Sequence, residues 1–481
     1  MINFSLILPE ISLFCGALFI ILSDSYLNKK FKDICYFSHI FALGSCAIAS
    51  FFAVKNIAFN QMLFSEMFVS NSFTSFVKSL TILFLVLIIL LSLSFIEKNK
   101  KISAEFLALL LIAAVGGMVM ISSNDFLTFY LGLEMQALCL YLLAAIDRSS
   151  KKSSEAGIKY FVLGCVASGI LLFGVSMIYG FSGSVNFRAL NNLYQTQNLE
   201  AYKNIPVGVM FGFVMVLISL FFKIAAAPFH MWSPDVYQGS SSISTTFFAS
   251  VAKFTTVLAL INIFSRVIIG WPGIENIFIF VAILSLFIGS FGAIFQKNLK
   301  RLLAYSSIGH IGFILLAMAS FSKQSFIACV LYMIIYVLIS IATFGFVAII
   351  KDKNNCDIEI SRLSGLSKTN PAMAFALAVL MFSSAGIPPL AGFFSKFYIL
   401  SAAISRGLLF WAIAAIIFSV ISAFYYLRIV KIMYFDEVKE KIEFENYSNS
   451  KLIIILIAIV NILFVFLLDI LLSLITNFIA F

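Results

Sequence analysis

Long apolar stretches alternate with short polar connections along the whole chain, and this pattern predicts the fold class. A helix needs about 20 predominantly apolar residues to cross the hydrocarbon core of a bilayer. The sequence contains fourteen such stretches, so we expect an all-α polytopic membrane protein with about 14 transmembrane helices. They lie near residues 4–23, 34–54, 73–96, 104–121, 125–146, 156–180, 206–238, 242–262, 273–295, 302–319, 325–350, 371–404, 408–427 and 451–477.

Composition agrees with this pattern. Hydrophobic residues make up 62% of the 481 residues and charged residues only 11%, whereas a soluble domain has about 25% charged residues. The first 21 residues, MINFSLILPEISLFCGALFII, lack the basic segment of a signal peptide, so we expect a retained first helix. The seven cysteines are scattered singly, without a CxxC pair or a Cys/His cluster, and this argues against disulfides and metal sites.

The basic residues are distributed unequally over the connections and thereby predict the topology. Odd-numbered connections hold 20 lysines and arginines, and even-numbered connections hold six. The positive-inside rule places the odd-numbered connections in the cytoplasm and both termini on the outer side of the membrane. Topology accounts for the net charge of +10, so we expect no nucleic-acid partner.

Three lysines lie deep inside apolar stretches: Lys223, Lys253 and Lys396. A lysine at the bilayer centre costs about 2.5–3.5 kcal/mol on insertion scales. We therefore favour an ion pathway over structural salt bridges for these three. Lys78 and Lys159 lie within two turns of predicted helix ends, where snorkelling explains a lysine equally well.

Two further residues are candidates for proton transfer. Glu134 lies midway through the fifth stretch, and a lysine from another helix would favour its charged form, so that one proton could switch the pair. His310 lies in the middle of the tenth stretch, and a histidine titrates near neutral pH, which suits a shuttle, although a satisfied core histidine is the alternative. His230 is either a shuttle or a cap at a helix break.

Acidic residues also occur in the two terminal stretches. Glu10 lies in the first and Asp469 in the last. For both, contact with a neighbouring subunit or a position at the membrane interface is as good an interpretation as chemistry.

The seventh and twelfth stretches are too long for one straight crossing, and both contain helix-breaking residues: AAAPFH at 225–230 and SAGIPPLAGFFSK at 384–396. Proline removes a backbone hydrogen bond, which lipid tolerates only where the freed groups face protein or a water-filled cavity. Lys223 precedes the first break and Lys396 follows the second. We interpret each break as the point at which water reaches a lysine.

The two lysines at the breaks lie 173 residues and five helices apart, and this spacing predicts inverted repeats. We expect N-terminal helices 1–3 in residues 1–103, a first repeat of helices 4–8 in 104–262, a second, inverted repeat of helices 9–13 in 263–434, and helix 14 in 435–481. The same offset carries Glu134 to position 307, one turn from His310. It carries Lys253 to position 426, beside Tyr425.

Four segments give the chain a resemblance to a known family: LTFYLGLEMQALCLYLLAA, KIAAAPFHMWSPDVYQG, FQKNLKRLLAYSSIGHIGF and AGIPPLAGFFSKFYIL. The chain resembles, over nearly its whole length, the antiporter-like membrane subunits of respiratory complex I and their relatives in multisubunit cation/proton antiporters. WSPDVYQG, a lysine at 396 and the absence of a long C-terminal lateral helix favour the N branch of the family over its L and M branches.

The resemblance implies a proton-translocating subunit of a bacterial inner-membrane NADH-quinone oxidoreductase. It implies no cofactor in this chain, with NAD, FMN, iron–sulfur clusters and quinone in other subunits, and it implies K- and M-type neighbours in the bilayer. The family pattern assigns proton transfer to five residues. Three more are possible secondary carriers: one matches a less central lysine of the family, and the other two follow from the helix break and from the 173-residue offset. The five are Glu134, Lys223, Lys253, His310 and Lys396, and the three are Lys159, His230 and Tyr425.

Three other functions are weighed against this one. A sodium/proton antiporter subunit is the nearest alternative, but sodium sites prefer oxygen ligands, and the deep ionisable residues are mostly lysines. A membrane scaffold would have unbroken helices and lysines only at helix ends. A quinone-binding enzyme rests only on the 55 phenylalanines, which membrane helices use for packing. We find no nucleotide-binding loop or nucleophile–base pair, so enzymatic activity belongs to an assembled complex.

Overall fold

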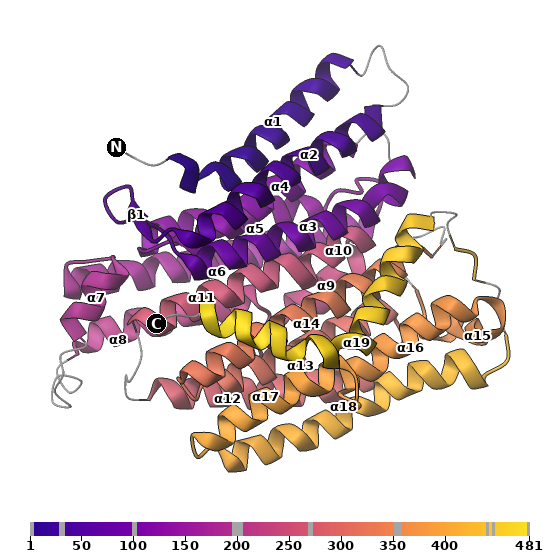
Figure 1. The fold of residues 1–481 in the computed structure, drawn as a ribbon. Coiled ribbons are helices and arrows are strands. Elements are labelled where there is room, and N and C mark those ends of the chain that lie inside the picture. The colour runs from indigo at the N-terminus through magenta and orange to yellow at the C-terminus, as the bar shows by residue number, and fades with distance from the viewer. Residues whose placement is uncertain are drawn as a thin grey trace.

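The computed structural model describes residues 4–27, 34–98, 103–194, 205–267, 273–350, 358–438, 442–444 and 448–478. Long helices lie side by side, from α1 and α2 at one end of the molecule to α18 at the other (Figure 1). The helices are α1 (Leu8–Leu27), α2 (Ile34–Lys55), α3 (Ser72–Lys98), α4 (Ser103–Ser122), α5 (Phe126–Ala144), α6 (Lys151–Ser182), α7 (Phe187–Tyr194), α8 (Val207–Lys223), α9 (Trp232–Gly239), α10 (Ser242–Phe247), α11 (Lys253–Val267), α12 (Ile274–Ile294), α13 (Leu299–Met318), α14 (Lys323–Ala348), α15 (Leu366–Thr369), α16 (Pro371–Ala385), α17 (Ala391–Ser405), α18 (Leu409–Phe435) and α19 (Ser448–Phe478).

The fourteen predicted crossings are all present. In the described residues, twelve helical segments are long and apolar enough to span a membrane, and α10 and α11 together make one of them. The seventh crossing is α8 followed by the short α9, and the twelfth is α16 followed by α17. The prediction that these two crossings are broken is therefore confirmed.

The freed backbone groups at both breaks find partners within the protein. At the first break, which follows α8, the backbone N–H of Ala227 donates to Ser285 Oγ at 2.9 Å. Trp232 Nε1 donates to the Phe222 carbonyl at 2.9 Å. Behind α16, Gly386 has a φ of 90°, a left-handed conformation that glycine adopts without strain. The N–H of Gly392 donates to Ser383 Oγ at 3.0 Å. At both breaks, groups of the protein therefore provide hydrogen bonds in place of those that an unbroken helix would make, as lipid surroundings require.

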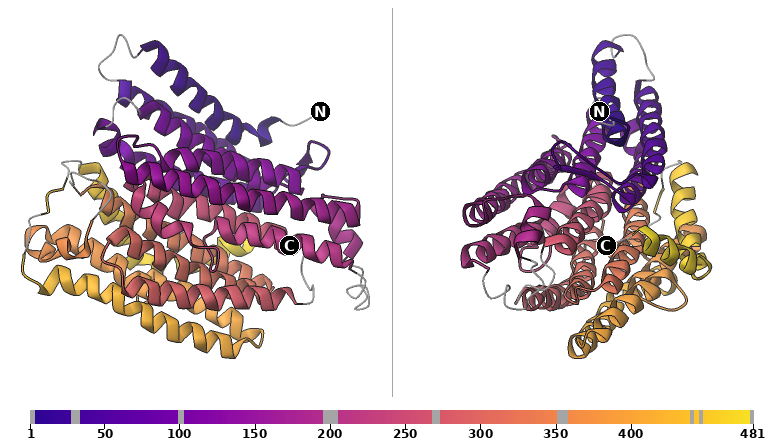
Figure 2. Two further views of the ribbon diagram at one scale, coloured as in Figure 1. Left: turned by 180° about the vertical axis from the view of Figure 1, so that it is seen from behind. Right: turned by 60° about the vertical axis from the view of Figure 1, so that its left-hand side comes forward.

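The breaks occupy equivalent places in two sets of five crossings. In α4 to α11 and again in α12 to α18, the broken crossing is the fourth of the set. Views from two further directions show the second set following the first along the molecule (Figure 2). This arrangement matches the predicted repeats, whose residue boundaries stay a prediction.

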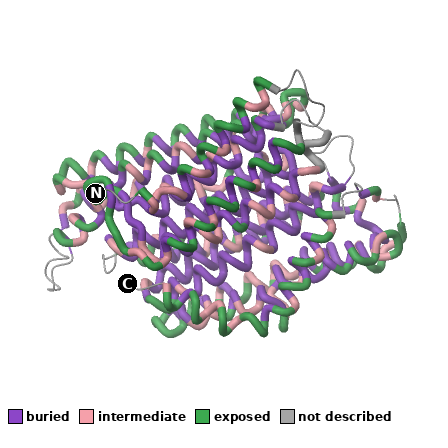
Figure 3. Tube along the Cα trace, turned by 45° about the horizontal axis from the view of Figure 1, so that its top comes forward, coloured by how far each residue is buried: buried purple, intermediate pink, exposed green. Residues whose placement is uncertain are grey.

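Burial follows this layout (Figure 3). The segment α10–α11 is buried on every side, and α14 is buried over most of its length, whereas only a minority of the residues of α1 and α18 is buried. The exposed apolar surface of the outer helices suits lipid. Polar residues of the central helices are consequently far from bulk water.

Short elements occur between the long helices and before the first of them. Strands β1 (Gln61–Leu63) and β2 (Phe68–Ser70) form an antiparallel hairpin, which sequence analysis missed. Single-turn 3₁₀ segments occupy Phe4–Leu6, Asn56–Ala58 and Ile360–Leu363. A π-helical turn, Phe248–Ala252, joins α10 to α11. π-turns within helices often occur at functional sites, and this one ends directly before Lys253.

Candidate functional site

The five predicted proton carriers lie on five different helices in the middle of the molecule. Glu134 is on α5, Lys223 ends α8, Lys253 begins α11, His310 is on α13 and Lys396 is on α17. Lys253 is 1% exposed and Lys396 is 7% exposed. Buried cations of this kind need polar partners, and each lysine has at least one hydroxyl partner.

The first pair joins α5 to α8. Ser168 of α6 donates a short hydrogen bond to Glu134 Oε1, and Lys223 Nζ donates to the Tyr141 hydroxyl at 3.1 Å. Glu134 and Lys223 interact electrostatically, but none of the ion pairs among the described residues joins them directly. The predicted pair is thus an electrostatic one, with Tyr141 as the direct partner of the lysine.

Lys253 connects the two sets of helices. Its ammonium donates to Ser307 Oγ of α13 at 2.8 Å and lies 5.5 Å from the centre of the Tyr237 ring. A ring face attracts a cation within about 6 Å. The lysine therefore reaches from the first set of helices to the second without a carboxylate partner.

His310 lies between two buried tyrosines. Its Nδ1 is 2.7 Å from the Tyr332 hydroxyl and its Nε2 is 3.1 Å from the Tyr426 hydroxyl. Tyr426 also makes a short hydrogen bond with Ser306. Lys253 and Lys396 both act electrostatically on the His310 ring, so this histidine lies between the two lysines.

Lys396 lies beside the second break. Its ammonium donates to the Ser384 and Ala385 carbonyls at 3.0 and 2.9 Å, and to Ser419 Oγ at 3.0 Å. The two carbonyls belong to the end of α16, where the broken helix leaves backbone oxygens without intrahelical partners. The break thereby places two backbone acceptors beside the lysine in the apolar interior.

A small cavity of about 10 Å³ separates His310 from Lys396, and Tyr426 and Ser422 also line it. A cavity of about 10–15 Å³ is the smallest that holds one water molecule. The space therefore fits a single water that would touch both titratable groups.

Each of the titratable groups at the centre of the protein thus has a hydroxyl group within hydrogen-bonding distance or acts electrostatically on one that has. A hydroxyl can donate and accept a hydrogen bond at once, and a neutral imidazole can do so through its two nitrogens. A series of such groups can pass a proton by successive donation. It cannot bind a metal cation in the same way, because protonated lysines have no lone pair to offer.

The three secondary candidates lie outside this series. Lys159 forms an ion pair with Asp235 at 2.9 Å and with Glu155 at 2.7 Å, and Arg301 reaches Asp235 at 2.6 Å. The Lys159 side chain is 42% exposed, so this network lies at the protein surface.

His230 and Tyr425 have neighbours other than the lysines. The His230 ring lies 6.5 Å from the Tyr305 ring. Tyr425 packs against Tyr426, with ring centres 4.4 Å apart. Of these two adjacent tyrosines, Tyr426 is the one that hydrogen-bonds His310.

The interpretations of Lys78 and Glu10 are corrected by the structure. Both side chains are buried, and their charged atoms lie 2.6 Å apart in an ion pair. The Lys78 ammonium also lies 4.6 Å from the centre of the Phe68 ring. Lys78 therefore does not snorkel, and the partner of Glu10 is within the chain. Asp469 is exposed on α19.

Several residues of the site were missed from the sequence: Tyr141, Ser168, Tyr332 and Tyr426 as partners, and Ser307 as the acceptor for Lys253. The 173-residue offset held a signal for two of them, since it carries Glu134 to Ser307 and Lys253 to Tyr426. Serine and tyrosine are common in membrane helices, so their type alone gives no signal.

Comparisons with known proteins show the family and the fold of the chain. The transmembrane family described as NADH:quinone oxidoreductase/Mrp antiporter matches residues 123–422. NADH-quinone oxidoreductase subunit N of Rhodospirillum rubrum is 42% identical over 412 residues, which cover 84% of this chain and 82% of that protein.

Solved structures show the same fold. A chain of respiratory complex I from Thermus thermophilus is similar with a TM-score of 0.82 and 25% identity, covering 97% of this chain and 98% of that one. A chain of the Mrp complex from Dietzia sp. has a TM-score of 0.83 at 20% identity, covering 99% and 97% of the two chains. The second likeness concerns the fold alone.

Proposed function

The chain belongs to the family of antiporter-like membrane subunits shared by NADH:quinone oxidoreductases and Mrp antiporters, and we propose that it translocates protons as the N-type subunit of a bacterial respiratory complex I. The observation that carries the proposal is the series of buried lysines, each on a hydroxyl partner, that leads from α8 through α11 to α17.

The proposed route uses charge as the switch. Protonation of Glu134 removes the negative charge that favours protonated Lys223, so Lys223 then releases its proton more readily. Lys253 takes up a proton and passes it through Ser307. His310 and the water-sized space beside it lead to Lys396, next to the second break. Tyr332 and Tyr426 orient the imidazole by hydrogen bonds to both of its nitrogens.

The driving reaction belongs to other subunits in this proposal. NAD, FMN, iron–sulfur clusters and quinone are bound elsewhere in the complex, and this chain supplies the groups that hold and move protons. Electron transfer would reach the route as a change of charge or position near Glu134. The surface network of Lys159, Asp235 and Arg301 is a secondary part of the proposal, as the connection between the surface and the buried residues.

The proposal also covers assembly and orientation. The chain lies in the bacterial inner membrane with both termini on the outer side, because the basic residues gather in the odd-numbered connections. Its neighbours are K- and M-type membrane subunits, in line with the complex in which the relatives occur.

Sodium/proton antiport is the alternative function, because the description of the matching family also names Mrp antiporters. The two functions are distinguished in inverted vesicles from cells that produce the complex with this chain. NADH oxidation should acidify the vesicle lumen equally in sodium-free and sodium-containing buffer. An absolute requirement for sodium, or sodium uptake in place of acidification, would overturn the proposal.

A further inference from the structure

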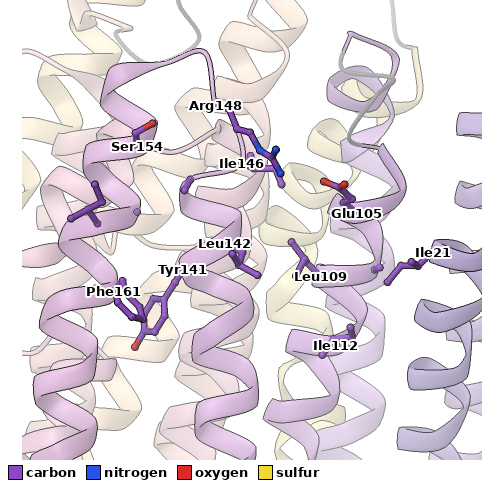
Figure 4. Close-up of a pocket in the computed structure, with 14 residues that line it drawn as sticks. Ile21, Glu105, Leu109, Ile112, Tyr141, Leu142, Ile146, Arg148, Ser154 and Phe161 are labelled. Atoms are coloured by element: carbon purple, nitrogen blue, oxygen red, sulfur yellow. The ribbon is translucent and has the colours of Figure 1, made fainter. Parts of the chain in front are cut away.

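A cavity of about 730 Å³ lies between α1, α4, α5 and α6, and Lys223, Lys253 and Lys396 are not among the residues that line it. Its walls are mostly apolar, and four of the wall residues are exposed at the outer surface: Ile21, Leu142, Ile158 and Phe161. Figure 4 shows α1 standing apart from α5 and α6 across this space. Because these helices span the membrane, the cavity opens into the bilayer.

One end of the cavity is polar. Arg148, from the connection between α5 and α6, and Glu105, from the first turn of α4, both line this end, and Ser154 lies nearby (Figure 4). None of the ion pairs in the described part of the chain joins Arg148 to Glu105. The end of the cavity therefore presents one cation and one carboxylate to whatever lies between them.

Polarity falls with depth along the same walls. Leu109 and Ile112 follow Glu105 by four and seven residues on the same face of α4, which places them about 6 and 10 Å further along the helix axis. Leu142 lies six residues before Arg148 on the way into α5. The cavity thus has charges at the level where helices end and hydrocarbon side chains below, which is the profile of a membrane lipid.

We propose that this cavity binds a zwitterionic phospholipid with a primary ammonium headgroup, such as phosphatidylethanolamine. Arg148 binds the phosphate, for which the guanidinium fork is suited, and Glu105 accepts hydrogen bonds from the ammonium. An acyl chain lies along Leu109, Ile112 and Phe161.

The headgroup assignment follows from the two charges. The phosphate of an anionic lipid would bind Arg148, but such a lipid has no cation to pair with the nearby Glu105 carboxylate. A choline headgroup has the positive charge but no N–H to donate to Glu105. The primary ammonium matches both groups.

The bound lipid would also lie beside the proposed proton route. Tyr141 forms part of the cavity wall, and its hydroxyl accepts the hydrogen bond from Lys223. An acyl chain in the cavity would keep water away from the outer side of this contact. The lipid site itself does not depend on the proposed function.

The experiment uses the purified whole complex in nanodiscs that contain a phosphatidylethanolamine probe with a photoreactive diazirine on one acyl chain. A phosphatidylglycerol probe with the same chain serves for comparison. After illumination, mass spectrometry maps labelled peptides. We expect the first probe to label peptides of α4, α5 and α6 about tenfold more than the second, since the Glu105 hydrogen bonds are charge-assisted.

Two variants and a matched control test the site. Leu109→Trp fills the cavity and should abolish labelling of these peptides, whereas Ile413→Trp on the exposed face of α18 should leave it unchanged. Glu105→Gln, a near-isosteric change that keeps the cavity open, should remove the preference for the ethanolamine probe while labelling persists. Equal labelling by both probes in the unaltered complex would overturn the headgroup assignment. Undiminished labelling in Leu109→Trp, or no labelling of α4–α6 in any sample, would overturn the site.

Discussion

Replacing Tyr426 by phenylalanine tests the part of the route where histidine and tyrosine meet. The change removes one oxygen atom and keeps the ring, so packing around α18 is preserved. It removes the hydrogen bond to His310 Nε2, 3.1 Å long, and the short one to Ser306. A buried polar atom left without a partner costs about 1–3 kcal/mol.

The size of the expected effect follows from this loss. If the proton passes His310 while its Nε2 lacks a partner, the barrier of that step rises by about the same 1–3 kcal/mol, which slows the step about 5- to 150-fold. Tyr434→Phe is the control, because Tyr434 lies about two turns further along α18, is 37% exposed and does not bond His310.

The assay compares both variants in inverted vesicles at equal complex content. Lumen acidification is followed with a pH-sensitive dye, and NADH oxidation is recorded in the same sample. We expect the initial rate of acidification to fall at least about fivefold in Tyr426→Phe, and to stay near the unaltered rate in Tyr434→Phe. Equal rates in the two variants would show that the Tyr426 hydroxyl is not part of the route.

Three further predictions concern other contacts. Lys78→Met leaves Glu10 buried without its cation, 2.6 Å from where the ammonium was, so the complex should lose about 3–5 kcal/mol of stability, seen as earlier thermal dissociation in detergent. The double variant with Glu10→Gln should recover most of that loss, and failure to recover would contradict the pairing. Ser307→Ala removes the hydroxyl that accepts from Lys253 at 2.8 Å and should lower proton pumping with assembly retained, as vesicle acidification would measure. Asp235→Asn acts on a partly exposed network, so we expect the stability of the complex to change by less than about 1 kcal/mol in the same dissociation assay. A larger change would contradict the surface placement.

Functional residues could be predicted from the sequence where placing the residue in a membrane helix has a large free-energy cost. A deep lysine or a proline within an apolar stretch is expensive in lipid, so Lys223, Lys253 and Lys396 and the two breaks were found without coordinates. The fourteen crossings followed from length and hydropathy alone, including the two that are broken.

Residues that membrane helices accommodate at little free-energy cost were not predicted. Tyr426 and Ser307 are ordinary members of membrane helices, and only three-dimensional contact makes them partners of His310 and Lys253. Lys78 was misjudged for a related reason. Its position near a helix end permits snorkelling, and nothing within α3 indicates that Glu10 of α1 lies 2.6 Å away. Such long-range pairings depend on helix packing, which local pattern does not encode.

The measurement that bears on the proton route as a whole is pumping by Lys396→Ala, with electron transfer and assembly recorded in the same vesicles. Lys451, which lies at the start of α19 at the edge of the membrane, provides the control variant Lys451→Ala. We expect Lys396→Ala to lose proton pumping while the complex stays assembled, and Lys451→Ala to pump normally. Normal pumping at normal turnover in Lys396→Ala would contradict the account and would favour a scaffold role for this chain.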